Sequence, residues 1–133
     1  MLKIEHLGIA VKSLDAAVPL YVQLLNTPCY KQETVATEGV NTAFFQTGQE
    51  KIELLEATNE DSPIAKFIAK KGQGIHHIAF DVTDIYAEIE RLKGEGFELI
   101  NLTPKSGADN KIIAFLHPKS TDGILVELCQ EKS

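Results

Sequence analysis

The sequence predicts an α+β fold in which one unit, a strand, a helix and further strands, is used twice. Two observations lead to this class. The run IEHLGIAV at residues 4–11 can be set over IHHIAFDV at residues 75–82, so that His6 falls on His77 with an offset of 77 − 6 = 71. Each run is followed by a segment with helical periodicity and then by short β-rich segments. Because two units are too few for a solenoid, we expect the halves to close against each other.

The first module contains the strand at 4–11, a helix over SLDAAVPLYVQLLN (13–26) and the β-rich segments NTAFFQT (41–47) and KIELLEA (51–57). The apolar residues of this helix recur at helical spacing and predict a buried stripe of Leu14, Val18, Tyr21, Val22 and Leu25. Pro19 lies early enough in the helix to be tolerated.

The second module repeats this order. It contains the strand at 75–82, a helix over TDIYAEIERLKGEGFEL (83–99), and the β-rich segments KIIAFLH (111–117) and GILVELC (123–129). The helix has Thr83 or Asp84 as its N-cap and an apolar stripe of Ile85, Ile89 and Leu92.

A short helix links the two modules. Its signals are a capping Ser62, Pro63 at the first helical position and Gly72 as the stop. We therefore expect the whole chain, 1–133, to form a single domain, with module one at about 1–58, the linking helix at about 60–72 and module two at about 74–131.

The last segments of the two modules also correspond. Glu53 in IELLEA matches Glu127 in ILVELC with an offset of 127 − 53 = 74. The two offsets differ by three residues, which is expected for diverged halves that differ by one loop insertion. The alternative is a chance similarity between two β-α units.

Strand parity separates the two adjacent histidines, because side chains alternate between the two faces of a strand. His76 shares a face with Ile78, Phe80 and Val82, and this bulky face must pack on a helix. His77 shares the other face with a small residue, Ala79. His6 likewise lies with the small residues Gly8 and Ala10. We therefore expect His6 and His77 to face one cleft, and His76 to be structural.

The two carboxylates follow the same rule. In the first module Ile52 and Leu54 form the packing face, so Glu53 points away from it. In the second module the packing residues are Ile124, Val126 and Leu128, so Glu127 points away as well. Burial of two carboxylates without a positive partner is unfavourable, and a divalent cation would accept both carboxylates and two neutral imidazoles. The alternative is that Glu53 and Glu127 face solvent.

Composition excludes several classes of partner. The chain has 133 residues, of which 44% are hydrophobic, and a net charge of −6, which argues against a nucleic-acid surface. We interpret the pair Lys70–Lys71 as a solvated helix end. Cys29 and Cys129 make no disulfide framework, and no segment approaches the length of a membrane span. We expect a soluble cytoplasmic protein that binds a small molecule, with no nucleic-acid or membrane partner.

Four segments carry a resemblance to a known family: HLGIAV, ELLEATNEDSPIAKF, GIHHIAFDV and FLHPKSTDGILVEL. Together with the paired halves they resemble the vicinal oxygen chelate superfamily, which includes glyoxalase I, extradiol dioxygenases and bleomycin-resistance proteins. Within it the chain is most similar to the methylmalonyl-CoA epimerases. DSPIAKF and the LHPK…GILVEL ending are the most specific segments, because glyoxalases usually end their last hairpin differently.

The resemblance implies a cup-shaped mixed sheet around one divalent metal ion held by His6, Glu53, His77 and Glu127. It favours cobalt, with manganese, nickel or zinc as alternatives that suit mixed His and carboxylate ligands. Some epimerases have Gln at the position of Glu53, so this ligand is closer to the glyoxalase set. The resemblance also implies a homodimer.

The implied reaction is epimerisation of methylmalonyl-CoA, an acyl-CoA substrate, by proton abstraction next to the thioester carbonyl through a metal-stabilised enolate. The resemblance gives Glu127 both a ligand and a proton-transfer role. The second acid–base group is Glu53, or Glu38 from the preceding loop, because several epimerases have Glu where this chain has Thr42. Thr42, His117 and Lys119 are expected near the substrate, with Lys119 reaching a phosphate.

Two rival functions remain. A glyoxalase I-type lyase acting on a glutathione hemithioacetal would use the same metal ligands. A metal-free protein that binds a small ligand, as bleomycin-resistance proteins do, would need none of them.

Overall fold

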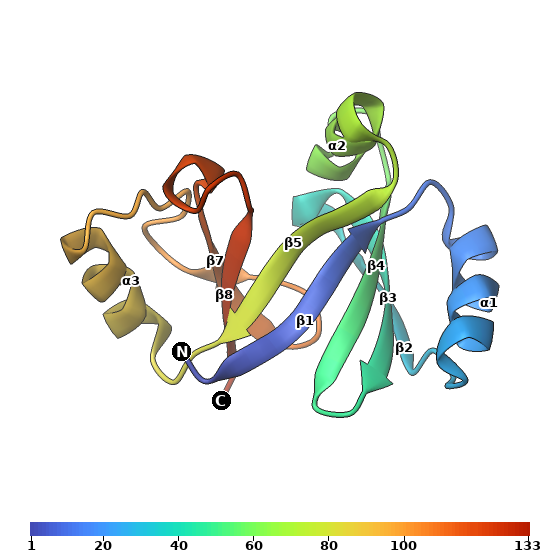
Figure 1. Cartoon of the computed structure of the whole chain (residues 1–133), viewed down its shortest axis with the longest axis horizontal. Coiled ribbons are helices and arrows are strands. Elements are labelled where there is room, and N and C mark those ends of the chain that lie inside the picture. The colour runs from blue at the N-terminus through green and yellow to red at the C-terminus, as the bar shows by residue number, and fades with distance from the viewer. The chain divides into compact units, whose positions relative to one another are not determined.

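The computed structural model describes residues 1–133 and contains two modules of the predicted kind, each with one strand, one helix and three further strands (Figure 1). The first module consists of β1 (Lys3–Ala10), α1 (Leu14–Leu25), β2 (Lys31–Val35), β3 (Val40–Thr47) and β4 (Glu50–Ala57). Its strand order is β2-β3-β4-β1. β1 runs parallel to β4, whereas β2, β3 and β4 are joined by antiparallel pairing.

The second module consists of β5 (Gly74–Asp81), α3 (Ile85–Gly94), β6 (Lys105–Ser106), β7 (Lys111–Leu116) and β8 (Val126–Glu131). The strand order β5-β8-β7-β6 matches that of the first module, and again the first strand runs parallel to the last. The linking helix α2 spans Pro63–Lys71. The sequence did not locate the edge strands β2 and β6, which carry few apolar residues.

The helix α1 covers one face of the first module. Ser13 caps it, accepting a hydrogen bond from the Ala16 N–H, and its buried residues Leu14 and Ala17 pack with Phe45 and Leu54. The predicted residues Val18, Tyr21 and Leu25 also pack there. The prediction for Val22 was wrong. Its side chain is 37% exposed, because the helix turns it to the edge of the stripe.

The helix α3 covers the equivalent face of the second module. Asp84, rather than Thr83, is its N-cap and accepts hydrogen bonds from two backbone N–H groups. The predicted residues Ile85, Ile89 and Leu92 pack with Leu128. The prediction that Ile124 belongs to this face was wrong: Ile124 precedes β8, lies in the loop and is 49% exposed.

In each module a side chain of the last strand accepts a hydrogen bond from the first backbone N–H of the helix. The Leu14 N–H donates to a carboxylate oxygen of Glu56 at 3.0 Å, and the Ile85 N–H donates to the amide oxygen of Gln130 at 2.7 Å. Glu56 and Gln130 each lie three residues after the carboxylate that was predicted to face away from the helix. Because the first backbone N–H groups of a helix have no partner within it, these contacts satisfy one of them in each module.

The helix α2 begins and ends as predicted. The Ser62 hydroxyl accepts from the Ile64 N–H, Pro63 is the first residue of the helix, and the Gly72 N–H closes it on the Ile68 carbonyl. Ile64 packs with Ala10 and Leu55, on the face of the first module opposite to α1.

The chain divides into two compact units, residues 6–76 and residues 77–133 together with 1–5. The single domain and the module bounds stated above remain predictions. No helix has the length and apolar character required to cross a membrane.

Candidate metal centre and active site

The first unit contains a buried pair formed by His6 and Glu53. His6 lies on β1 and Glu53 on β4, and their side chains meet with 3.2 Å between imidazole Nε2 and carboxylate Oε1. The two residues are only 5% and 4% exposed. Ile52 and Leu54 pack with α1, as predicted, so alternation along β4 turns Glu53 to the other face. Glu53 is therefore not one of the solvent-facing carboxylates of the alternative reading.

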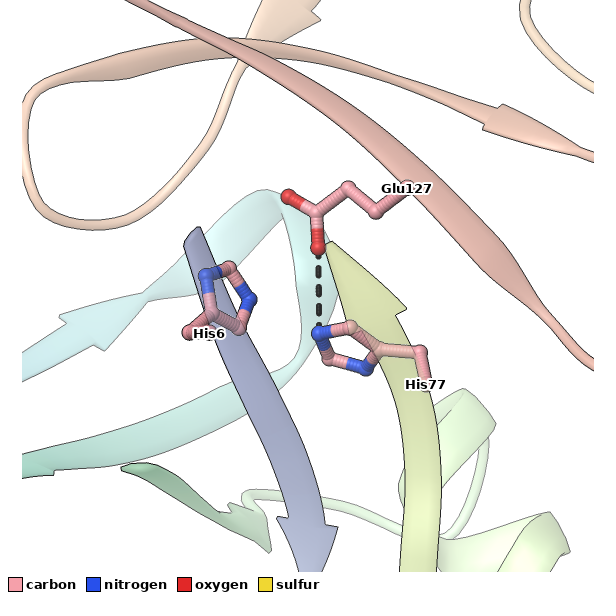
Figure 2. Close-up of side chains that lie close together, drawn as sticks. All are labelled: His6, His77 and Glu127. Carbon is pink, nitrogen blue, oxygen red and sulfur yellow. Dashed lines mark ion pairs between the residues drawn. The ribbon is translucent and has the colours of Figure 1, made fainter. Parts of the chain in front are cut away.

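The second unit contains the corresponding pair of His77 and Glu127. Figure 2 shows the Glu127 carboxylate directed at the His77 ring, with 3.0 Å between Oε1 and Nε2. The residues are 4% and 5% exposed. Val126 and Leu128 pack with α3, as predicted, and Glu127 points the other way.

The surroundings of the two carboxylates also match. In the parallel ladders Gly8 is the register partner of Glu53 and Ala79 that of Glu127, so each carboxylate has a small residue beside it. In the antiparallel ladders the partners are Phe44 and Phe115. Sequence reasoning missed these two phenylalanines, although their offset of 115 − 44 = 71 equals that of the histidines.

The adjacent histidines differ as parity predicted. The ring of His77 meets Phe115 edge-on at 6.0 Å between ring centroids, beside the pair described above. The ring of His76 meets Phe67 of α2 edge-on at 5.1 Å. His76 thus packs against α2 through Phe67, and His77 belongs to the buried polar pair.

The two pairs have the spacing of ligands to a cation. Two atoms bound to the same ion at about 2.1 Å are about 3.0 Å apart at right angles and about 3.4 Å apart at a tetrahedral angle. The observed separations of 3.2 Å and 3.0 Å fall in this range. The same separations allow an imidazole N–H to donate to a carboxylate, which satisfies each pair on its own.

The chemistry of these atoms suits a metal ion. His6, His77 and Glu127 are buried and form a group that could hold a metal ion, each offering one nitrogen or oxygen atom. Glu53, the fourth predicted ligand, is not part of this group and contacts His6. Mixed imidazole and carboxylate ligands are typical of sites for zinc and other first-row transition metals. These three residues therefore fit a divalent ion, and the role of Glu53 as a fourth ligand stays a prediction.

Thr42, which replaces the Glu of several epimerases, lies on β3 and is 1% exposed. Its hydroxyl donates to the Glu33 carbonyl at 3.0 Å. This contact gives the side chain a structural partner on the edge strand β2. Glu38, the other candidate acid–base group near this strand, is half-buried in a short 3-10 helix, Ala36–Glu38.

His117 and Lys119 lie in the loop between β7 and β8. His117 caps a short 3-10 helix, Pro118–Ser120, because its Nδ1 accepts from the Lys119 N–H at 3.2 Å. The Lys119 ammonium lies 3.1 Å from a carboxylate oxygen of Glu98. The predicted turn-shaping role of His117 agrees with this contact. The predicted substrate contacts of Thr42, His117 and Lys119 stay predictions.

Residues 5–115 match the model of the glyoxalase/bleomycin resistance protein/dioxygenase superfamily, and the chain belongs to that superfamily. The predicted α+β class and the glyoxalase fold are thereby confirmed. The match begins one residue before His6 and ends before β8, so it spans three of the four paired residues.

Relatives that match almost end to end give a narrower likeness. The uncharacterized protein YqjC of Bacillus subtilis is 44% identical over 132 residues, which cover 99% of this chain and 94% of that protein. The ethylmalonyl-CoA/methylmalonyl-CoA epimerase of Cereibacter sphaeroides is 41% identical over 130 residues, 96% of this chain and 97% of the relative.

A solved structure extends this likeness to the fold of the whole chain. A variant of the Streptomyces coelicolor methylmalonyl-CoA epimerase, in complex with 2-nitronate-propionyl-CoA, superposes with a TM-score of 0.94 at 34% identity. The match covers 100% of this chain and 96% of that one. The predicted resemblance to the methylmalonyl-CoA epimerases is confirmed.

Proposed function

We propose that this protein is an isomerase that epimerises methylmalonyl-CoA with the help of one divalent cation. The observation that carries the proposal is the pair of buried His–Glu contacts, one in each unit, in a chain whose full-length relatives include such epimerases. A fold alone would not support an activity, because one fold hosts many functions.

The reaction requires removal and return of a proton at the carbon between a carboxylate and a thioester carbonyl. When bound, a divalent cation would supply a Lewis acid that stabilises negative charge on the substrate's oxygens. The Streptomyces coelicolor relative is solved in complex with 2-nitronate-propionyl-CoA, and a nitronate is planar at carbon, as the proposed enolate would be.

His6, Glu53, His77 and Glu127 would hold the cation. Both imidazoles present Nε2 to the neighbouring carboxylate, so the same nitrogen atoms are available as ligands. Burial keeps water away from them and strengthens their attraction for a cation. Cobalt is the ion we favour from the resemblance, with manganese, nickel and zinc as alternatives.

Glu127 and Glu53 would also transfer the proton. Inversion at carbon needs a proton donor or acceptor on each face of the planar species. Glu127 and Glu53 are the buried carboxylates of the two pairs, and each pair contributes one. The Thr42 hydroxyl is a weaker candidate, because it already donates to a backbone carbonyl.

The rest of the proposal follows from the resemblance to the epimerases. The substrate is an acyl-CoA, and the active form is a homodimer. A cytoplasmic location is part of the same proposal, because Cys29 and Cys129 are not joined in a disulfide.

Exchange of a single hydrogen tests the proposal. One epimer of methylmalonyl-CoA, incubated with the protein and a divalent metal in deuterated buffer, should acquire one deuterium at the carbon between the two carbonyl groups, measured by mass spectrometry. Cobalt, manganese, nickel and zinc are tried in turn. Absence of exchange with all of them would refute the enzymatic claim, and glutathione-dependent loss of methylglyoxal would instead indicate a glyoxalase.

A further inference from the structure

The cations of this chain are unevenly paired. Several have a carboxylate partner, as Lys93 has in Glu90 and Lys119 has in Glu98. Five lysines have no carboxylate within ion-pair distance: Lys12, Lys66, Lys70, Lys71 and Lys132. Four of these five belong to one place in the first unit.

That place is α2 and the chain beside its C-terminal end. Lys66 and Lys70 are four residues apart and share a face of the helix, and Lys71 follows. Lys12 comes to the same end of α2, because its backbone N–H donates to the Gln73 side chain at 2.7 Å. We call Lys12, Lys66, Lys70 and Lys71 the α2 lysine cluster. Figure 1 shows α2 at one end of the first-module strands, where β1 ends.

The geometry of the cluster is partly fixed. The Lys71 ammonium lies 5.8 Å from the centre of the Phe67 ring, a cation–π contact. Phe67 in turn meets His76 edge-on. A lysine held in this way loses less conformational entropy when it binds an anion than a freely moving one.

Attraction by the helix C-terminus accounts for only part of this arrangement. Cations in the last turn are favoured by the helix dipole, which explains Lys70 and Lys71. It does not explain Lys12, which lies off the helix, or the like-charged pair of Lys66 and Lys70. α2 contains no acidic residue to offset that repulsion. A bound polyanion would offset it.

The helix that carries most of the cluster packs on the sheet face that also carries His6 and Glu53. α2 packs through Ile64 on Ala10 and Leu55, which share their sheet face with His6 and Glu53. From His6 to the end of β1 at Ala10 the chain advances about 13 Å at the rise of an extended strand, and Lys12 lies two residues further on. The pantetheine arm of coenzyme A, when extended, separates its thioester from its nucleotide phosphates by a comparable length.

We propose that the α2 lysine cluster binds the phosphate groups of the coenzyme A nucleotide while the thioester lies at the His–Glu pairs. This inference rests on the proposed function for the identity of the substrate. It replaces the interpretation of Lys70 and Lys71 as a solvated helix end. It also makes the cluster, rather than Lys119 with its Glu98 partner, the main phosphate contact.

The test compares two substrates in the double variant Lys70→Ala/Lys71→Ala. The KM for methylmalonyl-CoA should rise about tenfold with kcat unchanged, the loss expected for one charge-assisted hydrogen bond. The KM for methylmalonyl-pantetheine, which lacks the nucleotide, should not change. Alanine favours helix, so α2 should remain folded.

A matched control removes the same charge elsewhere. Lys93→Ala/Lys132→Ala takes away two exposed lysines outside the cluster and should leave both KM values unchanged. An unchanged KM for methylmalonyl-CoA in the Lys70/Lys71 variant would overturn the inference. So would an equal rise for both substrates, or a loss confined to Lys119→Ala.

Binding of free coenzyme A, measured by calorimetry, separates this inference from the proposed function. If the protein turns over neither thioester, the proposed function fails, and the titration still reports on the cluster. About tenfold weaker binding by the Lys70/Lys71 variant would then support the cluster, and equal binding by variant and parent would refute it.

Discussion

The two modules are alike around the buried His–Glu pairs and differ in the connection between their last two strands. His6 and His77, Gly8 and Ala79, and Phe44 and Phe115 are all separated by 71 residues. From Phe44 to Glu53 the chain advances nine residues, through a tight turn at Gly48, whereas from Phe115 to Glu127 it advances twelve. The extra three residues therefore lie in the loop between β7 and β8, which includes the 3-10 helix Pro118–Ser120.

This difference indicates which part of the module is constrained. The ladder partners of the two carboxylates are preserved, and so is the contact from the last strand to the helix start, made by Glu56 in one module and Gln130 in the other. The hairpin that follows the phenylalanine is free to lengthen. The loop holds His117 and Lys119, whose predicted substrate contacts stay predictions.

The largest expected effect comes from removing one histidine of either module. His6→Ala and His77→Ala should each lose the bound metal and lower turnover by more than about a hundredfold, exceeding the loss of an outer-shell partner. His76→Ala, its neighbour, should keep the metal and cost about 1 kcal/mol of stability through the lost contact with Phe67. Metal content by mass spectrometry and thermal unfolding distinguish these outcomes. Equal metal loss in His76→Ala and His77→Ala would contradict the parity assignment.

The next largest effect is a loss of kcat when either carboxylate, Glu53 or Glu127, is replaced. Glu127→Gln and Glu53→Gln keep an oxygen ligand but cannot accept a proton as a carboxylate does. Each should retain metal and lower kcat by about a hundredfold or more, as expected for loss of a general acid–base group. Full activity of Glu53→Gln with metal bound would show that Glu53 is a ligand alone, and that the second proton-transfer group lies elsewhere.

The sequence was sufficient to predict the paired residues because parity and repetition act together. Glu53 and Glu127 could each have faced solvent. Their shared position relative to a packing face made burial the better prediction, and both are buried. The internal pattern of IHHIAFDV also separated His76 from His77, since alternation along a strand needs no tertiary information.

Other features could not be predicted because they depend on contacts between distant segments. The edge strands β2 and β6 are short and polar, so their pairing with β3 and β7 leaves little apolar pattern. The prediction for Val22 was wrong because this residue lies at the edge of the apolar stripe of α1. The prediction for Ile124 was wrong because the parity rule was extended to a residue that precedes β8. The α2 lysine cluster was missed because Lys12 joins it through a contact with Gln73, 61 residues away.

A smaller effect on kcat is expected for replacement of Thr42. In the first module Thr42 of β3 pairs with Leu55 of β4, and in the second module Ile113 of β7 holds the equivalent place, opposite Cys129 of β8. Thr42→Ala should change kcat by less than about threefold and cost about 1 kcal/mol of stability, the net value of one hydrogen bond. Steady-state kinetics and denaturant unfolding give the two numbers. A collapse of kcat with unchanged stability would move the second acid–base role to this strand.

The smallest effect is a change in the free energy of unfolding that comes from one ion pair on α3. α3 carries an ion pair between Glu88 and Arg91 that α1 lacks, and the hydrogen bond from Arg91 holds the pKa of Glu88 below its ordinary value of 4.5. Because the folded-state pKa is lowered, the ionised Glu88 stabilises the protein at pH values above its ordinary pKa. This contribution is lost as the pH falls below that value and through the lowered pKa. Glu88→Gln should therefore cost about 0.5 kcal/mol at neutral pH, and less on acidification.

The control for this prediction lies on the same helix. Glu90 pairs with Lys93 at 3.5 Å, and its side chain is 72% exposed. Glu90→Gln should leave the free energy of unfolding nearly unchanged at every pH. A cost for Glu88→Gln that persists in acid would show that packing, and not charge, is responsible.

The central claim is that the two modules contribute to one shared cation, and the number of ions per chain tests it most directly. Purified protein saturated with cobalt and freed of excess metal should contain one ion per chain, and either His6→Ala or His77→Ala should reduce this to none. Two ions per chain, with each single variant retaining one, would mean that the His–Glu pairs are separate sites. No bound ion in the parent protein would equally contradict the account.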